Sequence, residues 1–199
     1  MPKYHQPKLG EPKLILASAS PRRAELLREA GFSFEIRPSS VMETIRPGEL
    51  PREFAIRMAL DKALDVSRTE KKVYVLGADT IVCLGTRIFG KPRDATQAHQ
   101  FLEELAGKTH DVITGYAIIE APDRMVTKGS VLSRVGLKQL TVEKIASYVA
   151  TEEPLDKAGA YAIQGIGKEL VEKIEGSFTN VVGLPVEELT PILENLGLK

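Results

Sequence analysis

The sequence predicts an α/β fold in which a mixed central β-sheet is flanked by helices. Short apolar runs typical of buried strands alternate with stretches whose apolar residues recur at helical spacing. Some neighbouring strand segments are separated only by a tight turn, which predicts antiparallel hairpins in the same sheet. The composition, 43% hydrophobic and 27% charged over 199 residues, is that of a chain able to bury its own core. Together these features favour a mixed sheet over a strictly parallel one.

Charge and cysteine content narrow the possible partners. Lys plus Arg and Asp plus Glu number 27 each, so nothing draws the whole chain toward nucleic acid or an anionic membrane. Cys83 is the one cysteine, which excludes an internal disulfide and fits a reducing cytoplasm. No apolar run has the length of a transmembrane helix or a signal peptide. We expect a cytoplasmic protein with a loose extension at residues 1–12 and a single domain at 13–199.

The first strand and helix have clear start and stop signals in the sequence. Residues 14–17 are apolar and predict a buried strand. Ser20 has the side chain of a helix N-cap, and Pro21 suits the first helical position, where no backbone N–H is missed. Gly31 is placed to close this helix in a left-handed conformation.

Arg22 and Arg23 in the first turn of this helix are unexpected, because the N-terminal end of a helix is already positive. Two arginines there are unfavourable unless an anion is bound. With the hydroxyls of Ser18 and Ser20 and the free N–H groups of the helix, they form a candidate phosphate site. The alternative is that both arginines point into solvent, and the local sequence leaves the two interpretations open.

The next segments bring an acidic loop and a lysine. Residues 32–37 alternate and predict a strand, and residues 38–48 form a loop that contains Glu43. Residues 51–66 form a helix, and Lys62 lies at or beside its apolar face. The lysine should either extend its ammonium to the surface or meet a buried anion.

Asp79 is the most suggestive carboxylate. Residues 73–78 are a strong strand, and Asp79 and Thr80 follow at its expected C-terminal end, before an extended run at 81–84. Open α/β sheets present ligand-binding residues at that position. An aspartate that only begins a turn is the alternative. A hairpin then leads into a short strand at 88–89.

Lys91 lies in a tight Gly-Lys-Pro loop after this hairpin. Asp94 begins a helix with a pattern like that of a capping box, and the helix ends near Gly107. Residues 110–119 and 125–137 form the clearest hairpin of the chain.

The C-terminal third continues the alternation. A helix capped by Thr141 covers residues 141–150, and one helical turn follows at 154–157. Residues 160–164 and 170–174 predict two further strands.

A glycine pair separates these last two strands. Gly165 and Gly167 with Lys168 resemble part of a P-loop, but the spacing and the following Ser or Thr are missing, which favours a plain glycine turn. Residues 176–184 read as a loop, and a last helix covers 185–196.

The side-chain inventory points to anion chemistry. The histidines and the single cysteine show no zinc-ligand spacing, and no Gly-x-Ser-x-Gly elbow is present. What remains are charged residues near the ends of elements, namely Arg22, Arg23, Glu43, Lys62, Asp79, Lys91 and Lys168. Cations with a few carboxylates suit a nucleotide and a hard divalent metal.

As a set, several motifs resemble the Maf family. They are Leu-Ala-Ser-Ala-Ser-Pro-Arg-Arg at 16–23, Gly-Ala-Asp-Thr at 77–80, Gly-Lys-Pro at 90–92, Thr-Gly at 114–115 and Ala-Gly-Ala-Tyr-Ala-Ile-Gln-Gly at 158–165. The resemblance implies a nucleoside triphosphate pyrophosphatase that uses a divalent cation, Mg or Mn. It also implies two lobes around a cleft, as in the inosine triphosphate pyrophosphatase-like (Maf/Ham) fold, and a homodimer.

Carried over by position, the resemblance implies site roles. Asp79 would be the general base or a metal ligand, and Glu43 would assist with the metal. Ser40 and Met42 stand where relatives often carry further acid, which weakens the metal role of Glu43. The implied phosphate-binding residues are Ser18, Arg22, Arg23, Lys62 and Lys91.

The resemblance also implies a base preference. The pyrimidine branch has glutamine where the branch acting on methylated guanosine triphosphate has glutamate, and Gln164 stands at that position. A glutamine amide both donates and accepts, which suits uracil and thymine. Gln164, Arg22 and Thr80 therefore point to dTTP and UTP. A nucleotide-binding regulator of septum formation, or a purine-preferring pyrophosphatase, are the alternatives.

Overall fold

A computed structural model of the chain describes residues 13–199, so the extension expected at 1–12 lies outside the described residues. Seven strands form one mixed sheet in the order β2-β1-β3-β5-β6-β7, with β4 paired to β3. β1 is parallel to β2 and β3, and the other pairings are antiparallel. The predicted α/β class is confirmed. The strands are β1 (Lys13–Leu16), β2 (Glu35–Ile36), β3 (Val73–Leu84), β4 (Arg87–Phe89), β5 (Thr109–Glu120), β6 (Arg124–Leu137) and β7 (Val171–Glu175).

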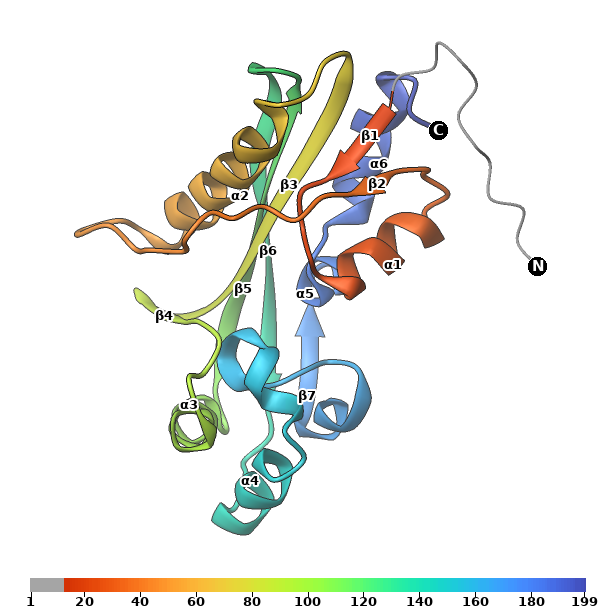
Figure 1. The fold of residues 1–199 in the computed structure, drawn as a ribbon. Coiled ribbons are helices and arrows are strands. Elements are labelled where there is room, and N and C mark those ends of the chain that lie inside the picture. Colours follow the sequence, from red (N-terminus) through yellow and green to blue (C-terminus); the bar gives the residue numbers. More distant parts are fainter. Residues whose placement is uncertain (1–12) are drawn as a thin grey trace.

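Helices flank this sheet on both faces. α2 lies along one face, whereas α1, α5 and α6 gather on the other, and α3 and α4 lie near one end of the long strands (Figure 1). None of the helices in residues 13–199 is both long and apolar enough to cross a membrane. The helices are α1 (Pro21–Glu29), α2 (Pro51–Ser67), α3 (Ala95–Leu105), α4 (Val142–Val149), α5 (Phe178–Val182) and α6 (Val186–Asn195), with 3-10 turns η1 (Glu153–Asp156), η2 (Ala158–Ala160) and η3 (Gly165–Leu170).

Two glycines let α2 lie directly on the sheet. A Cβ atom at Gly77 of β3 would lie 2.1 Å from the carbonyl oxygen of Ala59, and one at Gly115 of β5 would lie 2.2 Å from that of Ala55. Any larger residue would push the helix away. The close approach brings the polar side of α2 next to the residues that follow Gly77 on β3.

Strand β3 continues past the end of its neighbour, and this opens the site. β1 pairs with β3 only as far as Leu16 opposite Leu76, and β4 begins to pair at Val82. Between these points β3 has no strand on that side in the described part of the chain, while β5 pairs with it on the other side from Tyr74 to Cys83. Asp79 therefore lies in the middle of β3, not at a strand end as predicted. The strand that ends here is β1.

Two other element predictions were wrong. Residues 160–164 form no strand: Ala160 has a φ of +58°, which an extended strand does not allow, and the segment joins no sheet in the described residues. The segment predicted as a loop at 176–184 contains α5, since the Ser177 side chain caps it by accepting from the Asn180 N–H. The strand expected at 32–37 is reduced to Glu35–Ile36.

Candidate active site

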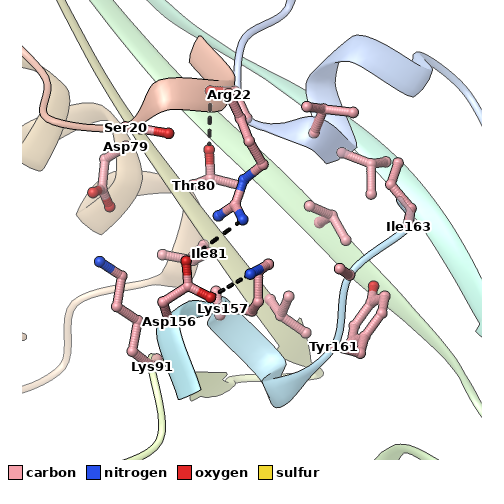
Figure 2. Close-up of a pocket in the computed structure, with 18 of the residues that line it drawn as sticks. Ser20, Arg22, Asp79, Thr80, Ile81, Lys91, Asp156, Lys157, Tyr161 and Ile163 are labelled. Atoms are coloured by element: carbon pink, nitrogen blue, oxygen red, sulfur yellow. Dashed lines mark hydrogen bonds and ion pairs between the residues drawn. The ribbon is translucent and has the colours of Figure 1, made fainter. Parts of the chain in front are cut away.

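A cavity of about 460 Å³ opens at the free edge of β3. An adjoining hollow of about 300 Å³ reaches Ser18 on the turn between β1 and α1. In Figure 2, Arg22, Asp79 and Thr80 lie on one side of the cavity, with Lys91, Asp156 and Tyr161 facing them. Lys168 lines neither space. The sequence-predicted residues that line the main cavity are Arg22, Arg23, Glu43, Lys62, Asp79, Thr80, Lys91 and Gln164.

Arg23 ties three parts of the chain together at the cavity wall. Its Nη1 donates to Ser18 Oγ at 3.2 Å, its Nη2 to Thr80 Oγ1 at 3.0 Å and its Nε to the carbonyl oxygen of Gly183 at 2.8 Å. Thr80 Oγ1 also lies 2.9 Å from Thr114 Oγ1. All three guanidinium nitrogens thus bind protein oxygens, which fixes the β1–α1 turn against β3 and the end of α5.

The start of α1 lacks its expected cap. Ser20 is at the N-cap position, as predicted, but its side chain accepts no hydrogen bond from the helix backbone. Instead, Ser18 Oγ accepts from the Ser20 N–H at 3.2 Å. The uncapped N–H groups and the macrodipole favour an anion at this end of the cavity.

Lys62 bridges the two candidate acids. Its Nζ lies 2.5 Å from Glu43 Oε1 and 2.6 Å from Asp79 Oδ1. The lysine therefore meets a buried anion, one of the two outcomes expected for it, because Asp79 is only 4% exposed. Burial raises the pKa of Asp79 above its ordinary value, although Lys62 and Arg23 pull it the other way. Burial also acts to raise the pKa of Glu43, but Lys62 and then Lys91 lower it overall.

The carboxylates fit a divalent cation that is also held by phosphate. Glu43 and Asp79 direct oxygens at one position, where the ammonium of Lys62 already shows that a cation is favoured. No group of three or more His, Cys, Asp or Glu side chains in residues 13–199 could hold a metal ion. Mg²⁺ is commonly bound through one or two carboxylates, with substrate phosphates and water completing its shell, and a pair of carboxylates matches that number.

The loop that carries Glu43 is fastened to α2 on both sides. Arg57 Nη2 donates to the carbonyl oxygen of Thr44 at 2.9 Å. Asp65 Oδ2 accepts from the N–H of Ser40 at 2.8 Å, and also from the Ser40 hydroxyl at 3.2 Å. Ser40 thus has a defined role in holding the loop.

The opposite wall contains residues that the sequence did not single out. Asp156 lies 3.8 Å from Arg22 across the cavity, as the dashed line in Figure 2 shows, and Lys157 lies beside it. Tyr161 is buried, and its hydroxyl lies 2.7 Å from Nε2 of the buried His110. The sequence signal that could have identified this wall is the pair of opposite charges at residues 156 and 157, just before the motif at 158–165.

Lys91 and Gln164 are exposed, and neither side chain makes a hydrogen bond or ion pair within residues 13–199. Both line the cavity from loops, Lys91 from the segment after β4 and Gln164 from the residue before η3. An ammonium and an amide are therefore presented to the cavity with their hydrogen-bonding capacity unused.

Comparison with known proteins places this site in a family. Residues 13–196 match the family described as Maf-like protein. A protein of Geobacter metallireducens called dTTP/UTP pyrophosphatase is 47% identical over 93% of this chain and 96% of its own length. A protein of the same name from Geobacter sulfurreducens is 48% identical over 93% of this chain and 97% of its own length. One from Gloeobacter violaceus is 46% identical over 91% of this chain and 94% of its own length.

The fold has a distant likeness among solved structures. The structure of a HAM1 protein from Coxiella burnetii superposes with a TM-score of 0.50 over 92% of this chain and 99% of that one, at 17% identity. This similarity supports the expected Maf/Ham type of fold. With a family match over nearly the whole described chain and relatives at almost half identity, the chain belongs to the Maf-like protein family.

Proposed function

We propose that the chain hydrolyses dTTP and UTP to the nucleoside monophosphate and pyrophosphate. The observation that carries the proposal is the buried Asp79 carboxylate, which lies among cations at the free edge of β3. The relatives named dTTP/UTP pyrophosphatase, at 46–48% identity over more than nine-tenths of the chain, support the same activity.

The triphosphate binds at the cation-rich end, where the cavity meets the adjoining hollow and the lining residues are Ser18, Arg22, Arg23, Lys62 and Lys91. Lys91 is free of protein partners in residues 13–199, and Arg22 has only a long contact to Asp156, so both can turn to phosphate oxygens. Arg23 adds positive charge while it holds the wall in place. Preorganised charge of this kind supplies most of the rate in phosphoryl transfer.

Asp79 takes the proton of the attacking water. The water oxygen forms a bond to the α-phosphorus, the bond from this phosphorus to the bridging oxygen breaks, and pyrophosphate leaves. A pKa raised by burial makes the Asp79 carboxylate a better proton acceptor than a solvated one. Lys62, in contact with Asp79, orients the carboxylate and compensates the charge that builds up on phosphate.

Glu43 and Asp79 are the residues proposed to hold a divalent ion, Mg or Mn. When bound, such an ion would neutralise phosphate charge and orient the triphosphate. Lys62 would then share its two carboxylate partners with the metal.

The base is proposed to lie toward Gln164. The glutamine amide can accept from N3–H and donate to O4 of uracil or thymine. Thr80 and Arg22, which also line the cavity, complete the proposed specificity set. We also retain the cytoplasm as the proposed location and a homodimer as the proposed assembly.

The test is pyrophosphate release from a panel of nucleoside triphosphates with Mg²⁺ or Mn²⁺. We expect dTTP and UTP to be cleaved fastest, and chelation of the metal to abolish turnover. Faster cleavage of GTP or ITP would favour the purine alternative. Nucleotide binding without cleavage of any triphosphate would favour a regulator.

A further inference from the structure

The segment around Gln164 is held by two side chains from a neighbouring part of the chain. Two residues before Gln164, the N–H of Ala162 donates to Tyr148 Oη at 3.2 Å. After it, the N–H groups of Ile166 and Gly167 donate to Glu153 Oε1 at 3.2 Å and Oε2 at 2.9 Å. Both oxygens of one carboxylate thus bind consecutive backbone donors, in the manner of an anion held by a nest.

The glycine pair makes room for these two groups. A Cβ atom at Gly165 would lie 2.2 Å from Glu153 Oε1, and Gly165 has a φ of +69° that favours glycine. A Cβ atom at Gly167 would lie 2.4 Å from Tyr148 Oη. The glycines that resembled part of a P-loop therefore serve close contact with Glu153 and Tyr148.

The amide of Gln164 has no support of its own. The side chain is exposed and makes no hydrogen bond within the described residues, so its position follows from the backbone on which it is mounted. That backbone is fixed on both sides, by Tyr148 before it and by Glu153 after it. Tyr148 is itself 2% exposed, which anchors the arrangement in the core around α4.

We infer that Glu153, assisted by Tyr148, is a positioning residue that sets the Gln164 amide for recognition of the nucleotide base. The inference rests on the proposed function and extends it to residues outside the implied catalytic set. A carboxylate suits the role because both its oxygens accept. An amide at the same position accepts with one oxygen only and sets its NH₂ group against the second backbone donor.

The experiment compares Glu153→Gln with the wild type and with Glu172→Gln, a control on β7 whose side chain is exposed and lies outside the cavity. Because charge-assisted hydrogen bonds are the strong ones, we expect Glu153→Gln to raise the KM for dTTP about tenfold, with kcat changed by less than about threefold. The preference for dTTP over GTP should fall in parallel. Glu172→Gln should leave both unchanged.

A purely structural role would give a different pattern. In that case Glu153→Gln would lower Tm and reduce turnover of dTTP and GTP equally, which would overturn the inference, as would an unchanged KM. Should Glu153→Gln fail to fold, Tyr148→Phe replaces it, and a rise of about threefold in KM is expected because one neutral hydrogen bond is lost.

Binding of dTTP, measured by calorimetry, separates this inference from the proposed function. A wild type that binds dTTP but does not cleave it refutes the function, and the dissociation constants of the variants then test the positioning. We expect the constant to rise about tenfold in Glu153→Gln. A wild type with no preference for dTTP over GTP in binding would overturn the inference.

Discussion

The two ends of the cavity are built in different ways. At the cation-rich end, Arg23 donates from all three guanidinium nitrogens and Lys62 contacts two carboxylates, all close to the buried Asp79. At the end proposed for the base, residues 161–165, the reading group is the exposed amide of Gln164, mounted on irregular backbone.

The difference follows from what each end has to do. Phosphoryl transfer requires charges fixed in place before the substrate arrives, because moving them during the reaction would cost free energy. Base selection requires a few hydrogen bonds of the right type, and a loop residue supplies these without disturbing the sheet. Substitutions should therefore affect turnover at the first end and preference at the second.

The largest effect is expected for Asp79→Asn. The amide cannot accept a proton from water, so kcat for dTTP should fall by about 100-fold or more. Nucleotide binding without added metal should be retained, because removing a negative charge leaves the cations more available to phosphate. Rapid-quench assays of pyrophosphate and calorimetric binding check the two parts. Unchanged turnover would rule out Asp79 as the base.

Arg23→Lys should have the next largest effect. A single ammonium cannot reach Ser18 Oγ, Thr80 Oγ1 and the Gly183 carbonyl together, so the wall loosens. We expect kcat/KM to fall at least about tenfold and the free energy of unfolding to drop by about 1–3 kcal/mol. Steady-state kinetics and urea unfolding measure these. If stability and activity both match those of the wild type, the three hydrogen bonds of Arg23 are not important for the site.

Gln164→Glu should change preference more than turnover. The carboxylate accepts only, so the donor to O4 of the pyrimidine is lost, while donors on guanine find a partner. The ratio of kcat/KM for dTTP to that for GTP should fall about tenfold, since one hydrogen bond to a charged group is involved. Tm should not change, because the exposed side chain makes no hydrogen bond or ion pair within residues 13–199. An unaltered ratio would place base recognition elsewhere.

His110→Gln should have the smallest effect on activity and a measurable one on acid stability. Burial lowers the pKa of His110 from 6.5 to about 4. As the pH falls below 6.5, the unfolded state binds a proton that the folded state does not, so the wild type loses stability from pH 6.5 down to about 4. This loss amounts to about 3 kcal/mol at most and is absent in the variant. Urea unfolding at pH 7.5 and 4.5 measures the free energy of unfolding of the wild type and the variant. An equal loss of stability in both proteins would contradict the expectation.

The sequence contained most of the helices and long strands, because capping residues and apolar periodicity are local signals. Asp94 and Thr141 cap their helices as expected. The prediction that the strand ends before Asp79 was wrong. Asp79 and Thr80 interrupt the apolar pattern, but β3 continues through them to Leu84. The reason lies in β5, which pairs with β3 from Tyr74 to Cys83, and in the missing neighbour on the other side of Asp79 in the described residues.

Residue spacing in the sequence could not predict which side chains meet in the folded chain. The sequence showed Lys62 beside an apolar helix face, but its contact with Asp79 joins residues 17 positions apart in the chain. The residues at 160–164 have the pattern of a strand, and the sequence gives no sign of the positive φ at Ala160 that an extended strand does not allow. The role of Glu153 depends on backbone donors 13 and 14 residues later, which spacing along the sequence does not reveal.

Attack of water on the α-phosphorus beside Asp79 is the central step of the proposed reaction, and one measurement tests it directly. Hydrolysis of dTTP is run in ¹⁸O-labelled water and the products are resolved by ³¹P NMR. We predict dTMP that carries the label, together with unlabelled pyrophosphate. Release of dTDP and inorganic phosphate, or label in the pyrophosphate, would contradict the account.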